Sequence, residues 1–250
     1  MKHAILGFVQ GITEFLPISS SGHLVISQHF FGIKSPGVTL EVFLHLATLF
    51  AILFFFKRDI RHFFTFKGNE WGKNPLIILV VIASLPIVIV GVLFKDKIES
   101  MFESIDYVKF FFLINGFILF TTLFSKGKRE DLSLSDALLV GLGQAVALLP
   151  GISRSGTTIT VALILGINKE RAFKFSFLLS IPAILGASLL EVIESGSFTI
   201  GCGEILGFLT AFFFGLLALL ILRRTVITGK LYLFGLYTLI LGGVIFILRC

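Results

Sequence analysis

The chain has 250 residues, of which 56% are apolar and 30 are Phe, while only 14% are charged. A soluble domain of this length could not enclose so much apolar surface, so the composition predicts that lipid is the solvent for much of the chain. The formal charge of +6 does not indicate a nucleic-acid partner, because the basic residues form no stripe interleaved with aromatic residues.

The first predicted element is a broken pair of short helices. Residues 3–16 and 20–32 are apolar segments on either side of Pro17-Ile18-Ser19. A helix that spans a bilayer needs about 20 residues, and both segments are shorter. Pro ends the first helix, and Ser is a good N-cap for the second. We therefore predict a re-entrant helix hairpin over residues 3–32.

The rest of the chain follows the same plan. Three apolar runs long enough to span the bilayer come next, at 39–57, 75–94 and 108–125. A second broken pair then flanks Pro150-Gly151-Ile152-Ser153 and predicts a hairpin over residues 136–166. Three further spanning runs complete the chain, at 170–192, 204–222 and 230–248. The expected fold class is an all-α integral membrane protein with six spanning helices.

The two halves match without gaps when one is shifted by about 134 positions along the other. Identical residues coincide at Gly7 and Gly141, Gln10 and Gln144, Ser19 and Ser153, Ser21 and Ser155, and Gly22 and Gly156. We expect one membrane domain, 1–250, built from repeats near 1–125 and 135–250. Because each repeat holds three spans, the second starts on the opposite side of the membrane. Such an inverted-topology repeat tends to place a site at its interface near mid-membrane.

The loop charges predict the orientation in the cell (plasma or inner) membrane. Lys and Arg concentrate on one predicted side, and acidic loops near Asp96 and Glu191 lie on the other. The positive-inside rule makes the basic side cytoplasmic, which puts both termini outside and opens the site to the outer face. The N-terminal segment is expected to stay in the mature fold, because Gln10, Glu14 and Pro17 disrupt the apolar run of a signal peptide.

The two hairpin tips predict an anion site. If they enter from opposite sides, two helix N-termini with positive dipole ends meet near mid-bilayer. Arg154 adds a planar donor fork suited to phosphate, at a cost of at least about 2.5–3.5 kcal/mol unless it is offset. An ion pair with Glu14 is the structural alternative, and close helix packing is the alternative for the small hydroxyl residues. The expected substrate-binding residues are Gln10, Ser19, Ser21, Ser153, Ser155, Thr157 and Thr158.

Acid–base and nucleophilic chemistry is expected in the first hairpin. Glu14 shares a helix face with Gln10 and could hold a divalent cation, act as a general base or only pair with a cation. His23 follows Ser20 by three residues and Ser19 by four, so a Ser–His pair could create a nucleophile. A satisfied polar contact is the alternative for this histidine. The expected catalytic residues are Glu14, Ser20, His23 and Arg154, with Glu14 also the expected metal ligand.

Two further pairs of residues have side chains that could belong to a site. Glu41 and His45 are four apart at the outer end of the first spanning run, where we expect them to line the entrance without belonging to the catalytic set. Cys202 and Cys250 lack the spacing of metal ligands, so a zinc site is not expected, and a disulfide between them stays open.

The motifs resemble a known family. Gln10-x-x-x-Glu14 followed by Phe-Leu-Pro-Ile-Ser-Ser-Ser-Gly-His, together with Pro-Gly-Ile-Ser-Arg-Ser-Gly-Thr-Thr over 150–158, is similar to undecaprenyl-diphosphate phosphatase of the bacitracin-resistance type. The likeness extends over essentially the whole chain. It implies hydrolysis of undecaprenyl diphosphate to the monophosphate, which recycles the lipid carrier for peptidoglycan and gives bacitracin resistance. It also implies a divalent cation, Mg or Ca.

Carried over to this sequence, the resemblance implies a role for each motif residue. Glu14 takes the metal and catalytic role, Ser20 is the proposed nucleophile with Ser19 beside it, His23 is the acid/base, and Arg154 clamps the phosphate. Direct attack by a water molecule in place of Ser20 is the open alternative. Many family members have Glu where this chain has Gln10. The chain therefore lacks the second carboxylate of a two-carboxylate metal site.

Two other functions are compatible with the pattern. Inverted repeats with broken helices also describe secondary transporters and flippases, which would bind an anionic or polyprenyl-phosphate substrate without turnover. A non-catalytic envelope scaffold is the weaker rival, and it would tolerate loss of Glu14 or Arg154. The expected partners are a polyprenyl diphosphate lipid and the membrane, with no nucleic acid. A homodimer stays open.

Overall fold

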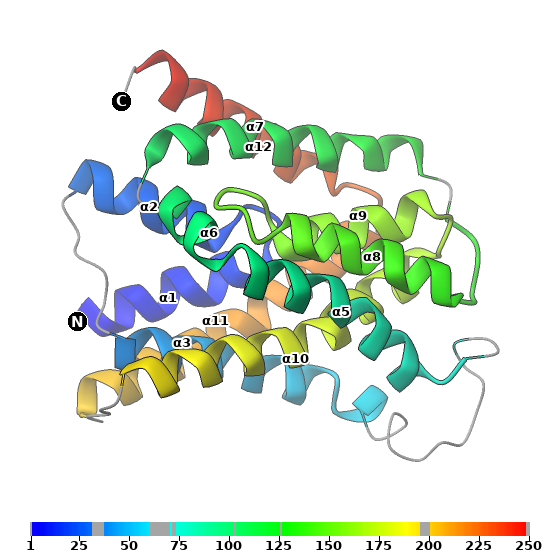
Figure 1. The fold of residues 1–250 in the computed structure, drawn as a ribbon, viewed down its shortest axis with the longest axis horizontal. Coiled ribbons are helices and arrows are strands. Elements are labelled where there is room, and N and C mark those ends of the chain that lie inside the picture. The colour runs from blue at the N-terminus through cyan, green and yellow to red at the C-terminus, as the bar shows by residue number, and fades with distance from the viewer. Residues whose placement is uncertain are drawn as a thin grey trace.

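The computed structural model describes residues 2–31, 38–60, 71, 74–102, 104–125, 127–195 and 201–248. These residues are almost all helical, and most helices run along the long axis of the molecule (Figure 1). The helices are α1 (Lys2–Phe15), α2 (Ser20–Phe31), α3 (Val38–Phe55), α5 (Leu76–Leu93), α6 (Lys95–Phe102), α7 (Ile105–Phe120), the 3-10 helix η1 (Thr121–Phe124), α8 (Leu134–Val146), α9 (Arg154–Ile164), α10 (Lys169–Ser195), α11 (Cys202–Ile227) and α12 (Tyr232–Ile247).

In the part of the chain that the structure describes, four segments are long and apolar enough to cross a membrane: α5, α7 with η1, α10 and α11. The other two predicted spans correspond to α3 and α12, whose apolar helices Leu40–Phe55 and Tyr232–Ile247 are shorter. Large apolar side chains cover the outer surface of the bundle, and Val92, Phe213 and Ile247 are 73%, 63% and 80% exposed. A surface of this kind requires lipid around it, as the composition predicts for an integral membrane protein.

Each half of the chain contains a broken helix pair. The break between α1 and α2 falls at residues 16–19, and the break between α8 and α9 falls at residues 147–153. Ser19 Oγ accepts the N–H of Gly22 at 3.3 Å, and Ser153 Oγ accepts the N–H of Gly156 at 3.2 Å. These serines therefore cap α2 and α9, as the sequence predicts. In Figure 1 the two pairs lie toward opposite ends of the molecule and meet in the middle.

The two breaks are in direct contact. The N–H of Gly151 donates to Ser19 Oγ at 3.2 Å, and Ser155 Oγ donates to the backbone oxygen of Phe15 at 2.8 Å. Gly151 has a φ of +108°, a backbone conformation that L side chains rarely adopt. A Cβ at Gly151 would also crowd the backbone of α7. Glycine at this position lets the second break pack closely against α7.

Asn115 of α7 ties both breaks to a third helix. Its fully buried side chain donates to the backbone oxygen of Pro17 at 3.1 Å and accepts the N–H of Ser153 at 2.9 Å. Both are backbone groups that the interrupted helices cannot satisfy themselves. One side chain thus fixes the position of both hairpin tips.

Each broken pair packs on a long helix from the other half of the chain. α1 lies so close to α11 that a Cβ at Gly7 would collide with the backbone oxygen of Gly207. α8 lies equally close to α5, because a Cβ at Gly141 would collide with the backbone of Ala83. Small residues at such contacts let helix backbones approach closely in membranes. Gly7 and Gly141 are also a pair that the sequence shift aligns.

An aromatic cluster packs against the C-terminal end of α1, next to the first break. Phe15, the last residue of α1, packs edge-to-face on Phe177 of α10 at 5.6 Å between ring centroids. Phe177 also contacts Phe56 and Phe173 at 5.9 and 4.9 Å. All four rings are buried. Because aromatic pairs bury much area in a fixed geometry, this core holds the C-terminal end of α1, and with it Glu14, against α10.

The double contact of Asn115 predicts that its replacement loosens both tips. Asn115→Leu leaves the backbone groups of Pro17 and Ser153 buried without partners, at about 1–3 kcal/mol each. We expect a clearly lower melting temperature for the purified protein in detergent. Phe117→Leu is the matched control, because Phe117 lies on the same helix and is 66% exposed. Equal melting temperatures for the two variants would contradict the clamp role of Asn115.

Candidate active site

A cavity of about 200 Å³ lies where the two broken helix pairs meet. The first residues of α2 and α9 line it, so two helix N-termini face the same space. Polar and apolar side chains share its wall. The polar ones are Thr13, Glu14, Ser19, Ser20, Ser21, His45, Gln144, Ser153 and Arg154, and the apolar ones are Ile87, Ala147, Leu148, Ile152, Ala183, Ile184 and Ala187.

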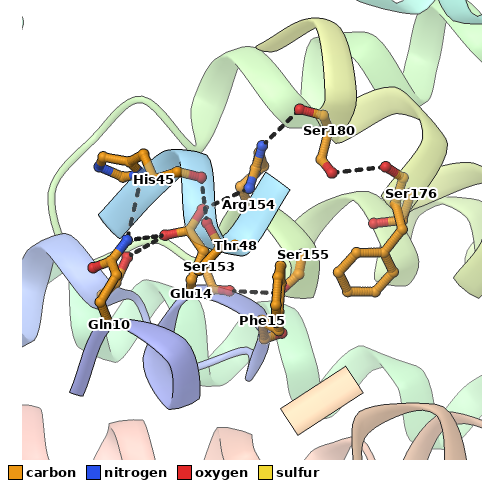
Figure 2. Close-up of polar contacts among 12 residues, drawn as sticks. Gln10, Glu14, Phe15, His45, Thr48, Ser153, Arg154, Ser155, Ser176 and Ser180 are labelled. Carbon is orange, nitrogen blue, oxygen red and sulfur yellow. Dashed lines mark hydrogen bonds and ion pairs between the residues drawn. The ribbon is translucent and has the colours of Figure 1, made fainter. Parts of the chain in front are cut away.

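An ion pair joins the two hairpins at this cavity. Arg154 Nη2 lies 2.7 Å from Glu14 Oε1, with the two side chains 19% and 9% exposed (Figure 2). Arg154 Nη1 also donates to the backbone oxygen of Ser180 at 3.4 Å. The pairing considered as a structural alternative is therefore present, and it offsets the burial of both charges. A guanidinium has five N–H donors, so these two contacts leave Arg154 able to meet an anion in the cavity.

The second oxygen of Glu14 organises the first hairpin. Ser20 Oγ donates to Glu14 Oε2 at 3.0 Å, and Gln10 Nε2 donates to the same oxygen at 3.2 Å. Gln10 Nε2 also lies 3.3 Å from Nδ1 of His45 (Figure 2). Because an amide nitrogen only donates, this Nδ1 accepts and the His45 ring carries its proton on Nε2. The Ser20 hydroxyl therefore donates to the Glu14 carboxylate. His45, which we expected at the entrance, lines the cavity.

His23 lies beside the cavity. Its Nδ1 is 2.7 Å from the backbone oxygen of Ser19, which can only accept, so Nδ1 carries the proton. Its Nε2 lies 2.7 Å from the hydroxyl of Tyr237. Among the described residues, those that line the cavity do not include His23. The sequence could not indicate this tyrosine, because it is 214 positions away on α12.

The hydroxyl residues of the second motif have three kinds of surroundings. Ser153 lines the cavity beside Arg154. Ser155 bonds to the first hairpin as described above, and Thr158 Oγ1 donates to the backbone oxygen of Arg154 at 2.8 Å and lies 2.6 Å from Ser176 Oγ. The hydroxyl of Thr157 is buried without a hydrogen-bond partner in the described part of the chain. Ser155 and Thr158 thus fix the start of α9 and the backbone that carries the arginine.

No ready-made metal cluster appears in the described residues, where no three His, Cys, Asp or Glu side chains gather to hold an ion. Glu14 nevertheless suits one mode of cation binding. Mg²⁺ is often held by one or two carboxylates together with substrate phosphates and water, and Glu14 presents one carboxylate in the cavity. Cys202 is exposed, and Cys250 lies outside the described residues, so their pairing stays open.

Comparison with known proteins gives a consistent result. The model of a family described as "Bacitracin resistance protein BacA" matches residues 3–244. A protein of Thermosipho africanus named undecaprenyl-diphosphatase is 42% identical over 254 residues, which cover 98% of this chain and 99% of that protein. Proteins of the same name from Methanobrevibacter smithii and Methanococcus vannielii are each 41% identical, over 97% and 95% of this chain and 95% of their own length.

The ion pair predicts a characteristic stability pattern. Arg154→Met leaves the Glu14 carboxylate buried without its partner, which costs about 3–5 kcal/mol. Adding Glu14→Leu removes the stranded charge, so the double variant regains most of the lost stability. Melting temperatures of the purified variants in detergent test this. A double variant that melts below the Arg154→Met single variant would show that the two charges do not act as a pair.

Proposed function

The chain belongs to the bacitracin resistance protein BacA family, and from this we infer that it is a membrane enzyme that hydrolyses undecaprenyl diphosphate to undecaprenyl phosphate and inorganic phosphate. This reaction recycles the lipid carrier of cell-wall synthesis and accounts for bacitracin resistance. The observation that supports it most directly is the arrangement of Ser20, Glu14 and Arg154 in one cavity that also has an apolar wall.

We propose that the substrate lies across the cavity with its terminal phosphate at the polar wall. Arg154 and the N-termini of α2 and α9 supply positive charge and N–H donors for this phosphate. The isoprenoid tail extends out of the cavity along the apolar wall, past Ile87, Leu148 and Ala187. A diphosphate lipid carries this combination of a compact anion and a long apolar chain, so it matches both parts of the wall.

Ser20 is the proposed nucleophile. Its Oγ attacks the terminal phosphorus, the bond from that phosphorus to the bridging oxygen breaks, and undecaprenyl phosphate leaves. The hydroxyl proton passes to Glu14, to which it is already hydrogen-bonded. Water then cleaves the phosphoserine and releases inorganic phosphate. Phosphoryl transfer has a loose transition state in which positioning and charge stabilisation supply most of the catalysis, so Arg154 contributes by stabilising the charge on the transferred group.

His23 is proposed to position the nucleophile. Its bond to the Ser19 carbonyl fixes the residue before Ser20, and Ser19 has a strained φ of +65°. The acid/base role that the family resemblance implies would require Nε2 of His23 to release the hydroxyl of Tyr237. We therefore assign His23 to shaping the turn.

A divalent cation, Mg or Ca, fits beside Glu14. The Glu14 carboxylate and the side-chain oxygen of Gln10 would hold it, together with phosphate oxygens and water. When bound, the cation neutralises charge on the phosphate oxygens. Because Glu14 already pairs with Arg154, the protein offers one shared carboxylate, and the substrate itself would supply much of the ligand set.

The membrane arrangement is also a proposal. We propose that α3 and α12 complete six spans, that both hairpins are re-entrant, and that the repeats are inverted with both termini and the site opening outside. The matched contacts of α1 on α11 and α8 on α5 support this reading. So do the positions of the two hairpins toward opposite ends of the molecule in Figure 1, where α1 begins and α12 ends on the α1–α2 side.

Phosphate release tests the function. Purified protein in detergent, given a polyprenyl diphosphate, is expected to release inorganic phosphate, whereas a carrier would release none. Ser20→Ala should lower kcat by about 10²–10⁴-fold, with phosphoserine trapped only in the wild type. Ser84→Ala is the matched control, because the Ser84 hydroxyl bonds within α5 and Ser84 is not among the described residues that line the cavity. Full activity of Ser20→Ala would contradict the proposed role of Ser20 as the nucleophile.

Removal of divalent cations tests the proposed ion. Chelation should abolish most phosphate release, and added Mg or Ca should restore it, because the ion offsets charge on the diphosphate. Glu14→Gln should raise the concentration of Mg needed for half-maximal activity. Unchanged activity after chelation would mean that Arg154 and the helix N-termini alone neutralise the substrate.

A further inference from the structure

Gln144 of α8 has an unusual environment. Its side chain is fully buried, it lines the cavity, and neither its Nε2 nor its Oε1 has a hydrogen-bond partner in the described part of the chain. Leaving a buried amide without partners costs free energy. Buried polar groups of this kind are rare and call for an explanation, and a ligand that completes the missing bonds is one.

The internal repeat explains how this amide lost its partners. Gln144 corresponds to Gln10, whose amide nitrogen contacts Glu14 and His45. The positions that correspond to these two partners hold Leu148 and Leu179. The second repeat therefore keeps the glutamine and replaces both of its partners with apolar side chains.

The place of Gln144 in the wall indicates which part of the substrate it meets. Gln144 lies near the C-terminal end of α8, and Ala147 and Leu148 follow directly after this helix. Both line the cavity together with Ile87 of α5, so the neighbours of Gln144 in the wall are apolar. Glu14 and Arg154 line the polar wall. A polar group among these apolar neighbours lies where the isoprenoid tail joins the phosphate that remains on the lipid.

We propose that Gln144 binds the lipid-linked phosphate of the diphosphate, with Nε2 donating to one of its oxygens. This inference rests on the proposed function. It assigns the two phosphates to different walls of the cavity. Arg154 and Ser20 hold the terminal phosphate, which is released, and Gln144 holds the phosphate that stays with the lipid. The contact exists before and after cleavage, so it contributes to binding of both substrate and product and little to the chemical step.

Gln144→Leu keeps the approximate volume of the side chain and removes the amide. We expect KM for a polyprenyl diphosphate to rise about tenfold, as loss of one hydrogen bond to a charged group predicts, while kcat changes by less than about threefold. Inhibition by polyprenyl monophosphate should weaken in parallel, and inhibition by inorganic phosphate should not change. Gln144→Glu, which adds a negative charge, should weaken lipid binding further.

Stability separates this role from a structural one. Without substrate, Gln144→Leu should melt at or above the temperature of the wild type, because a buried unpaired amide is removed. Thr160→Val is the matched control, since the Thr160 hydroxyl is also buried and unpartnered among the described residues but does not line the cavity. This control should leave KM and monophosphate inhibition unchanged.

Each contrary result has a distinct meaning. A wild type that releases no phosphate contradicts the proposed function and, with it, this inference. An active wild type whose KM is unaffected by Gln144→Leu contradicts the inference alone. Weaker inhibition by inorganic phosphate in Gln144→Leu would place the amide at the terminal phosphate and overturn the assignment. A change in KM of similar size in Thr160→Val would show that the effect is not specific to the cavity.

Discussion

The ion pair between Glu14 and Arg154 is the constraint on which the rest of the structure depends. It joins two segments 140 positions apart inside a protein whose outer surface needs lipid. Neither charge is favourable there alone. Bringing the two together requires both helices to stop inside the molecule, and the interrupted backbones then need partners of their own. Asn115 and the two capping serines supply them.

The two repeats supply different chemistry from corresponding positions. Ser20 and Arg154, the first residues of α2 and α9, coincide under the sequence shift. One of these positions carries the proposed nucleophile, and the other carries the cation that balances the phosphate. Glu14 and Leu148 also correspond, so one wall of the cavity is charged and the other is apolar. Corresponding positions of the sequence repeat thus line the cavity with different chemistry.

The sequence predicts the features that depend on local chemistry. Proline near each break and the capping roles of Ser19 and Ser153 follow from short-range rules, and the helices of the structure stop and restart there. Contacts between distant segments do not follow from such rules. His23 contacts Tyr237, and the Gln144 amide has no hydrogen-bond partner among the described residues, because of which side chains the packing brings near them. The spacing of residues within one motif does not contain this information.

The packing of α1 on α11 has a consequence for assembly. The glycines of α1 are synthesised at the start of translation. The surface on which they pack belongs to α11, Cys202–Ile227, which is synthesised near the end. The N-terminal hairpin can take its final position only after α11 has entered the membrane, so docking is a late, long-range step of folding. A fragment that contains only the first repeat lacks this surface, and the two repeats therefore mature together as one unit.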